Sequence, residues 1–245
     1  MSPRSRRFAE AVATAAAGSV LGGLAARAVG LGDVALTVAA VAGANGAISG
    51  WRQIYAWRRP TGVVAFVLDS TWSAPMTAAG LVGHAVGFVQ RDSGYVADLS
   101  RRADRHVYRR GFTPRRGFAT TLGPVVAGAG DVTSARRRRL VVDHEHVHCW
   151  QARWLGPAFP VLYVGWTVLG GAVGVVVWLL ARRDQRFTDV VETFGYYLNP
   201  LEWWAYSRDG DWPPRGKVDG LGWSDPCCRP LVAVRADRGS PAAPR

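Results

Sequence analysis

Long apolar runs alternate with short arginine-rich segments along this chain of 245 residues. Apolar and small residues extend from about Ala9 to Leu24 and again from Val34 to Ile48, with only Gly30–Asp33 between them. Two such runs joined by a short glycine-containing link predict an N-terminal transmembrane helical hairpin. Arginines flank both ends of this hairpin, which predicts that both ends lie on the cytoplasmic side.

The first apolar run also allows a second interpretation. Arginines precede it and Ala26-Arg27-Ala28 follows it, so a cleaved secretory signal is the alternative. The second apolar run begins at once, which favours the hairpin. The next segment, Trp51–Pro60, combines Trp, Tyr and Arg, and this mixture is typical of a membrane–water boundary.

Between residues 61 and 139 glycine, proline and arginine interrupt the apolar pattern. Ala74–Gln90 is Gly-rich and apolar, and it predicts a further membrane-associated segment. Short runs of β-branched and aromatic residues follow, and their spacing predicts a small antiparallel β-meander. These runs are Tyr95–Leu99, His106–Tyr108 and Phe118–Val126.

The C-terminal part has three apolar or amphipathic segments and a polar end. Leu140–Leu155 predicts a helix that a Gly-Pro pair ends. Val161–Ala181 is the most apolar stretch and carries no charge, so as a helix it is long enough to span a bilayer. Thr188–Ser207 predicts a second helical region, and the Gly/Pro/Arg-rich residues 211–245 predict a flexible tail.

Composition narrows the possible partners. Hydrophobic residues make up 49% and charged residues 20% of the chain, which argues against a disordered protein. The net charge of +12 favours anionic lipid headgroups as partners. Lys217 is the only lysine, and such a strong preference for arginine over lysine indicates the base composition of the genome. The net charge is therefore weaker evidence for an anionic partner. The basic run Arg136–Arg139 contains no aromatic residue, which argues against nucleic-acid binding.

The cysteines exclude two kinds of small-domain scaffold. The chain has three, at Cys149, Cys227 and Cys228, and none forms a C-x-x-C pair. An odd count without such a pair excludes a disulfide framework and a structural zinc knuckle.

The candidate chemistry lies in a cluster of histidines. Three of the five histidines fall within His144-Glu145-His146-Val147-His148, which contains H-E-x-x-H. On a helix His144 and His148 share one face one turn apart, so their imidazoles can bind one Zn²⁺. Glu145 lies about 100° round the helix, where its carboxylate can take a proton from metal-activated water. A catalytic zinc site needs a third protein ligand and leaves one position for water.

The flanking residues extend this pattern to a known group. With Val141, Val142, Val147, Cys149 and Trp150 around the motif, the segment resembles the zincin metallopeptidases. In their glutamate-type branch, which includes some integral-membrane peptidases, the third ligand is a downstream glutamate that often stands in E-x-x-A-D on a second helix.

The second helical region contains a similar element. Glu202-Trp203-Trp204-Ala205-Tyr206 resembles E-x-x-A-D, with Tyr206 in the place of the aspartate. The resemblance covers Leu140 to Tyr206 and implies that His144, His148 and Glu202 hold zinc while Glu145 acts in peptide-bond hydrolysis. Glu192 is the rival third ligand.

The departure at Tyr206 removes a carboxylate that orients a metal ligand in those enzymes. Asp143, Asp189 and Asp69 are the candidates to replace it.

Other prominent residues have simpler interpretations. We expect His146 to face away from the metal, Cys149 to be an inert buried thiol and His84 to serve packing, whereas Trp203 and Trp204 are expected to be interface anchors.

The apolar stretch separates the histidine pair from both glutamates. If it crossed the bilayer once, Glu202 and His144 would be about 30 Å apart, against a metal–ligand reach of about 2 Å. A break at Gly170-Gly171 would leave two arms too short to span. We therefore expect a re-entrant or in-plane helical hairpin, or a buried core helix.

The expected fold is α+β and mostly helical. It has a membrane hairpin (1–60), a membrane-associated segment with a β-meander (61–139), a zincin-like metal domain (140–210) with an apolar insert (161–181), and a tail (211–245). The expected function is that of a zinc metallopeptidase of the cell membrane, with its site on the cytoplasmic side and a peptide or protein as substrate. The alternatives are a zinc-binding pseudoenzyme with a role in assembly and a non-catalytic membrane scaffold. The particular substrate and the oligomeric state stay open.

Overall fold

The computed structural model describes residues 2–90, 93–113, 117–181 and 185–209. The chain forms two compact units, Met1–Pro157 and Ala158–Arg245. The described residues are mostly helical and include one small sheet. The predicted tail, residues 211–245, and the cysteines Cys227 and Cys228 lie outside the described residues.

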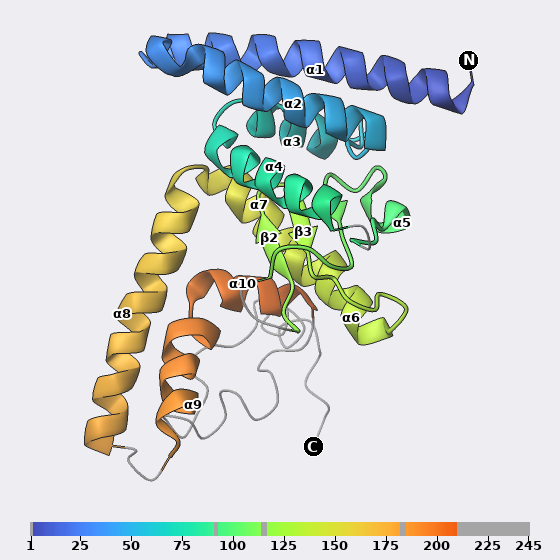
Figure 1. The fold of residues 1–245 in the computed structure, drawn as a ribbon. Helices are drawn as coiled ribbons and strands as arrows, with labels where there is room; N and C mark the ends of the chain where they lie inside the picture. Colours follow the sequence, from blue (N-terminus) through green and yellow to red (C-terminus); the bar gives the residue numbers. More distant parts are fainter. Residues whose placement is uncertain (1, 91–92, 114–116, 182–184, 210–245) are drawn as a thin grey trace, which may run out of the picture. The chain divides into compact units, whose positions relative to one another are not determined.

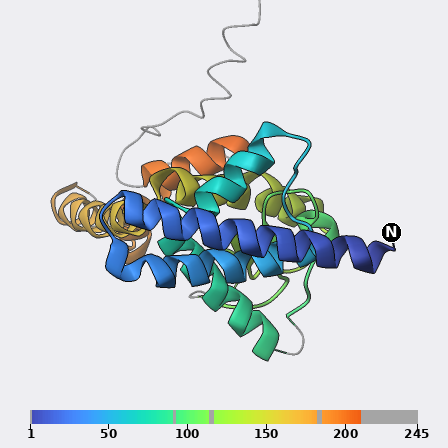
Figure 2. The ribbon, with the colours of Figure 1, turned by 90° about the horizontal axis from the view of Figure 1, so that it is seen from above.

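The N-terminal hairpin is confirmed. Helix α1 (Pro3–Ala28) and helix α2 (Ala35–Arg52) lie side by side in Figures 1 and 2, joined through the 3₁₀ turn η1 (Gly32–Val34). Glycine permits this close approach, because a Cβ atom at Gly18 would lie 2.9 Å from the Ala42 carbonyl oxygen. Both helices are long and apolar enough to cross a membrane.

Two shorter apolar helices connect the hairpin to the rest of the first unit. Helix α3 (Pro60–Ser70) packs against α1 and α2, and helix α4 (Ala74–Val89) packs against α2 and the sheet. The 16 residues of α4 are fewer than the roughly 20 that a bilayer span needs.

The sheet is mixed, so the predicted antiparallel meander is wrong. Its strands lie in the order β1 (His106–Val107), β3 (Val125–Ala127), β2 (Thr120–Leu122), with β1 parallel and β2 antiparallel to β3. One predicted run supplies both β2 and β3, because Gly123 turns the chain with a positive φ of 54°. Another run, Tyr95–Leu99, contributes an isolated bridge to Tyr108 and then enters the short helix α5 (Ala97–Ser100).

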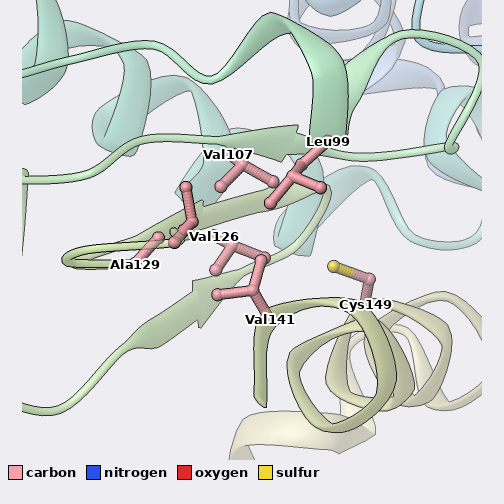
Figure 3. Close-up of a cluster of buried hydrophobic side chains, with 7 residues drawn as sticks. Leu99, Val107, Val126, Ala129, Val141 and Cys149 are labelled. Atoms are coloured by element: carbon pink, nitrogen blue, oxygen red, sulfur yellow. The ribbon is translucent and has the colours of Figure 1, made fainter. Parts of the chain in front are cut away.

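The predicted helix over Leu140–Leu155 is confirmed and carries the sheet on one side. The short helix α6 (Ala135–Arg139) continues through a π-helical turn, η2 (Leu140–His144), into α7 (Glu145–Leu155). Figure 3 shows the core between α7 and the sheet, where Val141 and Cys149 face the strands. The buried members of this core are Leu99, Val107, Val126, Ala129, Val132, Val141 and Cys149. Gly156, with a φ of 52°, ends α7 as expected.

The second unit begins with the apolar helix α8 (Ala158–Ala181), which is continuous over 24 residues. The predicted break at Gly170-Gly171 is therefore wrong. The alternative of a buried core helix is wrong too, because only 11% of its apolar window is buried. The glycines serve helix packing instead, since a Cβ atom at Gly170 would clash with the Phe194 carbonyl oxygen and one at Gly174 would lie 3.0 Å from Val191 Cα.

The chain folds back after α8. Helix α9 (Phe187–Glu192) and the π-helical turn η3 (Thr193–Tyr197) pack along α8, as Figure 1 shows for α9, and helix α10 (Pro200–Asp209) follows. At the end of this return the Asn199 side-chain amide lies 3.4 Å from the Tyr163 carbonyl oxygen, near the start of α8. The apolar helix is a third candidate membrane span, together with α1 and α2.

Candidate metal centre

The two histidines of the motif lie on one face of the α7 segment with their ring nitrogens facing each other. The Nε2 atoms of His144 and His148 are 3.2 Å apart, and both side chains are buried. Two nitrogens bound to one tetrahedral zinc ion at about 2.05 Å would lie about 3.3 Å apart. The spacing of the pair therefore matches that of two ligands on a single metal ion.

A glutamine fixes the second histidine. Gln151, fully buried one turn further along α7, accepts a hydrogen bond of 2.8 Å at Oε1 from His148 Nδ1. The proton on Nδ1 leaves the Nε2 lone pair available to a metal, and such a partner also holds the ring in orientation. Gln151 was not predicted from the sequence, although its i+3 spacing from His148 on the same helix could have indicated it.

The third predicted ligand lies in the second unit, in the first turn of α10. Glu202 is buried, and the Tyr163 hydroxyl of α8 donates a 2.5 Å hydrogen bond to its Oε1 atom. Burial, followed by the charge of Glu202, raises the pKa of Tyr196 and of Tyr206 above the usual range. Both phenols are therefore neutral at pH 7.

The contact with Tyr163 shows at which end of the apolar helix α8 Glu202 lies. Tyr163 is in the second turn of α8, so Glu202 lies near the end of α8 that directly follows α7 in the chain. The return through α9 and η3 achieves this without a break inside the helix. Within the second unit, the return of the chain therefore brings Glu202 back to the first turns of α8.

The three predicted ligands form a buried group that could hold a metal ion. The ligand atoms of His144, His148 and Glu202 all lie within 4.8 Å of one another. Two imidazole nitrogens and one carboxylate oxygen are a donor set that zinc accepts. Within the described part of the chain Glu192, the rival third ligand, does not belong to this group.

Glu145 directly follows His144 in the chain and is buried beside strand β2. The Thr121 hydroxyl donates a 2.7 Å hydrogen bond to Oε2 of Glu145, which fixes the orientation of this carboxylate. Thr121 could not be predicted from the sequence, because its contact with Glu145 depends on how the sheet packs against α7.

His146 has surroundings of a different kind. It accepts a 2.7 Å hydrogen bond at Nδ1 from Arg105, and it lies outside the group of His144, His148 and Glu202. Burial, reinforced by the charges of Arg105 and Arg153, lowers the pKa of His146 to about 3. Its ring is thus a neutral packing element, in line with the expectation for this residue.

The aspartates considered as replacements for the missing carboxylate have other contacts. Asp69 forms a fully buried ion pair with Arg153, with two N–O distances of 2.9 Å, and accepts a hydrogen bond from Tyr55. This pair ties α7 to α3. Asp189 lies 4.0 Å from the exposed Arg186, and Asp143 is part of the π-helical turn before α7.

Comparison with known proteins adds no relative. No family model, no curated protein and no solved structure matches this chain.

Proposed function

We propose that this protein is a membrane-associated zinc metallopeptidase, with His144, His148 and Glu202 as the ligands. The single observation that carries the proposal is the buried group of two histidines and one glutamate, assembled from an H-E-x-x-H helix and a later helix. When bound, zinc would supply the Lewis acid that activates water and polarises the peptide carbonyl. The resemblance of Leu140–Tyr206 to the zincin metallopeptidases supports the same assignment.

In this proposal each protein group has a separate task. Gln151 keeps the His148 proton on Nδ1, so that Nε2 faces the metal. Glu145, oriented by Thr121, accepts a proton from the attacking water and passes it to the nitrogen of the leaving amine. Tyr163 holds the carboxylate of Glu202.

The proposed location is the cell membrane, with the site on the cytoplasmic side and a peptide or protein as substrate. Three helices long and apolar enough to cross a membrane support the location. The arginines at both ends of the N-terminal hairpin support its orientation and favour contact with anionic lipid headgroups.

A zinc-binding pseudoenzyme with a role in assembly is the second candidate. One observation favours it, namely that Tyr206, a neutral phenol, stands where the zincin metallopeptidases that this segment resembles often have an aspartate. Loss of that carboxylate removes an orienting partner while leaving the three ligands in place.

Metal content and turnover test both candidates. We expect the purified chain to hold about one zinc ion, and His144→Ala to lower metal affinity by at least a hundredfold, because the site loses one of three protein ligands. Glu145→Gln should keep the metal and lower peptide hydrolysis by roughly a thousandfold or more, because the proton acceptor is lost. His146→Gln, on the same helix but outside the group, is the control for metal content.

Three outcomes separate the possibilities. Metal that persists in His144→Ala would contradict the ligand assignment. Metal bound as expected with no hydrolysis of a peptide library by the unmodified chain would favour the pseudoenzyme. Hydrolysis that survives Glu145→Gln would remove Glu145 from the mechanism.

A further inference from the structure

A cavity of about 330 Å³ lies in the first unit, bounded by the loops next to the sheet and by α6. Three arginines line it, Arg109, Arg110 and Arg137, together with the polar side chains of Gln90 and Thr113. No acidic side chain is among the described residues that line it. The volume is at the lower end of the range for small-molecule pockets, large enough for more than a bare ion.

Arg137 is held in the cavity wall by backbone carbonyls. Its Nε atom donates to Ala129 at 2.6 Å, and its Nη2 and Nη1 atoms donate to Gly128 at 2.5 Å and Gly117 at 3.1 Å. A guanidinium has five N–H groups, so two remain for a ligand. Carbonyl oxygens orient the charge of Arg137 but do not neutralise it.

The backbone around Arg137 needs glycine. Gly128 and Gly130 have φ values of 70° and 68°, which other residues rarely adopt. A Cβ atom at Gly130 would lie 3.1 Å from Arg137 Nε, and one at Gly128 would clash with Thr113. The two glycines thus let the chain wrap closely around a fixed cation, which indicates a built site.

Two of the arginines that line this cavity, Arg109 and Arg137, form no ion pair with an acidic side chain among the described residues. The nearby Asp131 accepts two hydrogen bonds from Thr133, and these bonds, with a smaller contribution from the charge of Arg109, lower the pKa of its carboxyl. Burial lowers the pKa of Arg137, with the charge of Glu145 opposing and that of Arg136 reinforcing this shift, so the half-buried cation would gain from an anion close by.

We propose that this cavity binds a phosphate-bearing ligand. Phosphate matches several converging guanidinium groups better than a single carboxylate does, because it presents more acceptor oxygens and carries up to two charges. The hydroxyl of Thr113 and the amide of Gln90 add neutral hydrogen-bonding groups of the kind that such pockets use. The ligand is either a phospholipid headgroup or a soluble phosphate ester, which share this chemistry.

The test measures binding to the full-length chain in detergent, with inorganic phosphate and glycerol phosphate as soluble probes. Vesicles of phosphatidylcholine with and without phosphatidic acid test the lipid source. Each measurement is repeated after chelation of metal, because phosphate can also bind zinc. Arg109→Gln is the main variant, since Arg137 also holds three carbonyls and its loss could unfold the loops.

Arg138→Gln is the matched control, because Arg138 is exposed on α6, does not line the cavity and carries the same charge. We expect Arg109→Gln to weaken phosphate binding at least tenfold with or without metal, and Arg138→Gln to change it less than twofold. Binding of soluble esters would identify a soluble ligand, and Arg109-dependent binding confined to phosphatidic acid vesicles would identify a headgroup. Equal effects of the two variants, or binding that disappears with the metal, would overturn the proposal.

Discussion

At the scale of single residues, the proposed metal site depends on side chains that hold the ligands. Tyr163 provides one such contact, with a 2.5 Å hydrogen bond to Glu202. It belongs to the apolar helix α8, whereas Glu202 belongs to α10, so one phenol sets the position of a carboxylate that the chain reaches 39 residues later. Partners of this kind typically contribute 10- to 100-fold to metal affinity.

We therefore expect Tyr163→Phe to lower zinc affinity by about 10- to 100-fold while leaving the fold intact, because only the hydroxyl is removed. Competition with a zinc chelator of known affinity measures the effect. Thr167→Val is the matched control, since it removes a hydroxyl one turn further along α8 that bonds only to the Tyr163 carbonyl. Equal affinities for Tyr163→Phe and the unmodified chain would show that the phenol does not position Glu202.

The three residues of the candidate metal group could be found from the sequence, and most of their hydrogen-bond partners could not. His144 and His148 follow from helical periodicity, which places residues four apart on one face whatever the rest of the fold does. Glu202 followed from a resemblance. Thr121 and Tyr163 contact the site through sheet packing and helix return, and neither has a local signature in the sequence. The contact of Gln151 with His148 could have been predicted from the sequence, because it depends only on the helix that carries both residues.

At the scale of elements, a glycine pair in an apolar helix can either break the helix or allow close packing of another segment, and the sequence alone does not distinguish the two. Gly170-Gly171 in an apolar run predicted a break, yet α8 is continuous and the glycines receive the returning chain. The predicted antiparallel pairing of the sheet was wrong for a similar reason. Short runs of β-branched and aromatic residues identified its strands, but the parallel pairing of β1 with β3 depends on non-local contacts that such runs do not report. The N-terminal hairpin and the α7 helix, by contrast, are set by local patterns.

The return of the chain along α8 can be tested with two glycines of the same helix. Gly170→Ala should separate α8 from η3 because its methyl group would meet the Phe194 carbonyl, and we expect a loss of about 1 to 3 kcal/mol of stability and weaker zinc binding. Gly165→Ala adds the same methyl group where nothing lies within 4 Å, so it should be neutral or stabilise the helix by up to about 1 kcal/mol. Unfolding in denaturant and chelator competition measure both effects. If the two variants behaved alike, the close packing at Gly170 would be refuted.

At the scale of the whole molecule, a second pair of histidines joins the hairpin to the sheet within the first unit. His84 of α4 and His106 of β1 are buried with ring centroids 4.3 Å apart. His84 Nδ1 lies 2.8 Å from the Tyr108 hydroxyl, and His106 Nε2 lies 3.0 Å from the Ser49 hydroxyl of α2. The expected packing role of His84 therefore agrees with its surroundings, and both rings are neutral components of a polar contact between helices and sheet.

This pair makes global stability sensitive to acid. Burial, followed by the charge of Arg52, lowers the pKa of His84 from 6.5 to about 4, and burial also lowers the pKa of His106. Between pH 6.5, the pKa of His84 in the unfolded chain, and about pH 4, its pKa in the folded chain, the unfolded chain binds a proton at His84 and the folded chain does not. Stability is therefore complete above about pH 6.5 and falls as the pH drops towards 4. For His84 alone the loss between pH 7 and pH 5 amounts to about 2 kcal/mol.

Denaturant unfolding in detergent at pH 7 and pH 5 tests this, with His84→Gln as the variant that cannot titrate. We expect the variant to lose about 2 kcal/mol less than the unmodified chain over this interval, because one proton no longer distinguishes the two states. Acid also releases metal from histidine ligands, so both chains are compared in a His144→Ala background, which removes that contribution from the difference. An unchanged pH dependence in His84→Gln would mean that the buried ring accepts a proton without unfolding, and that the contact between α4 and the sheet tolerates a charge.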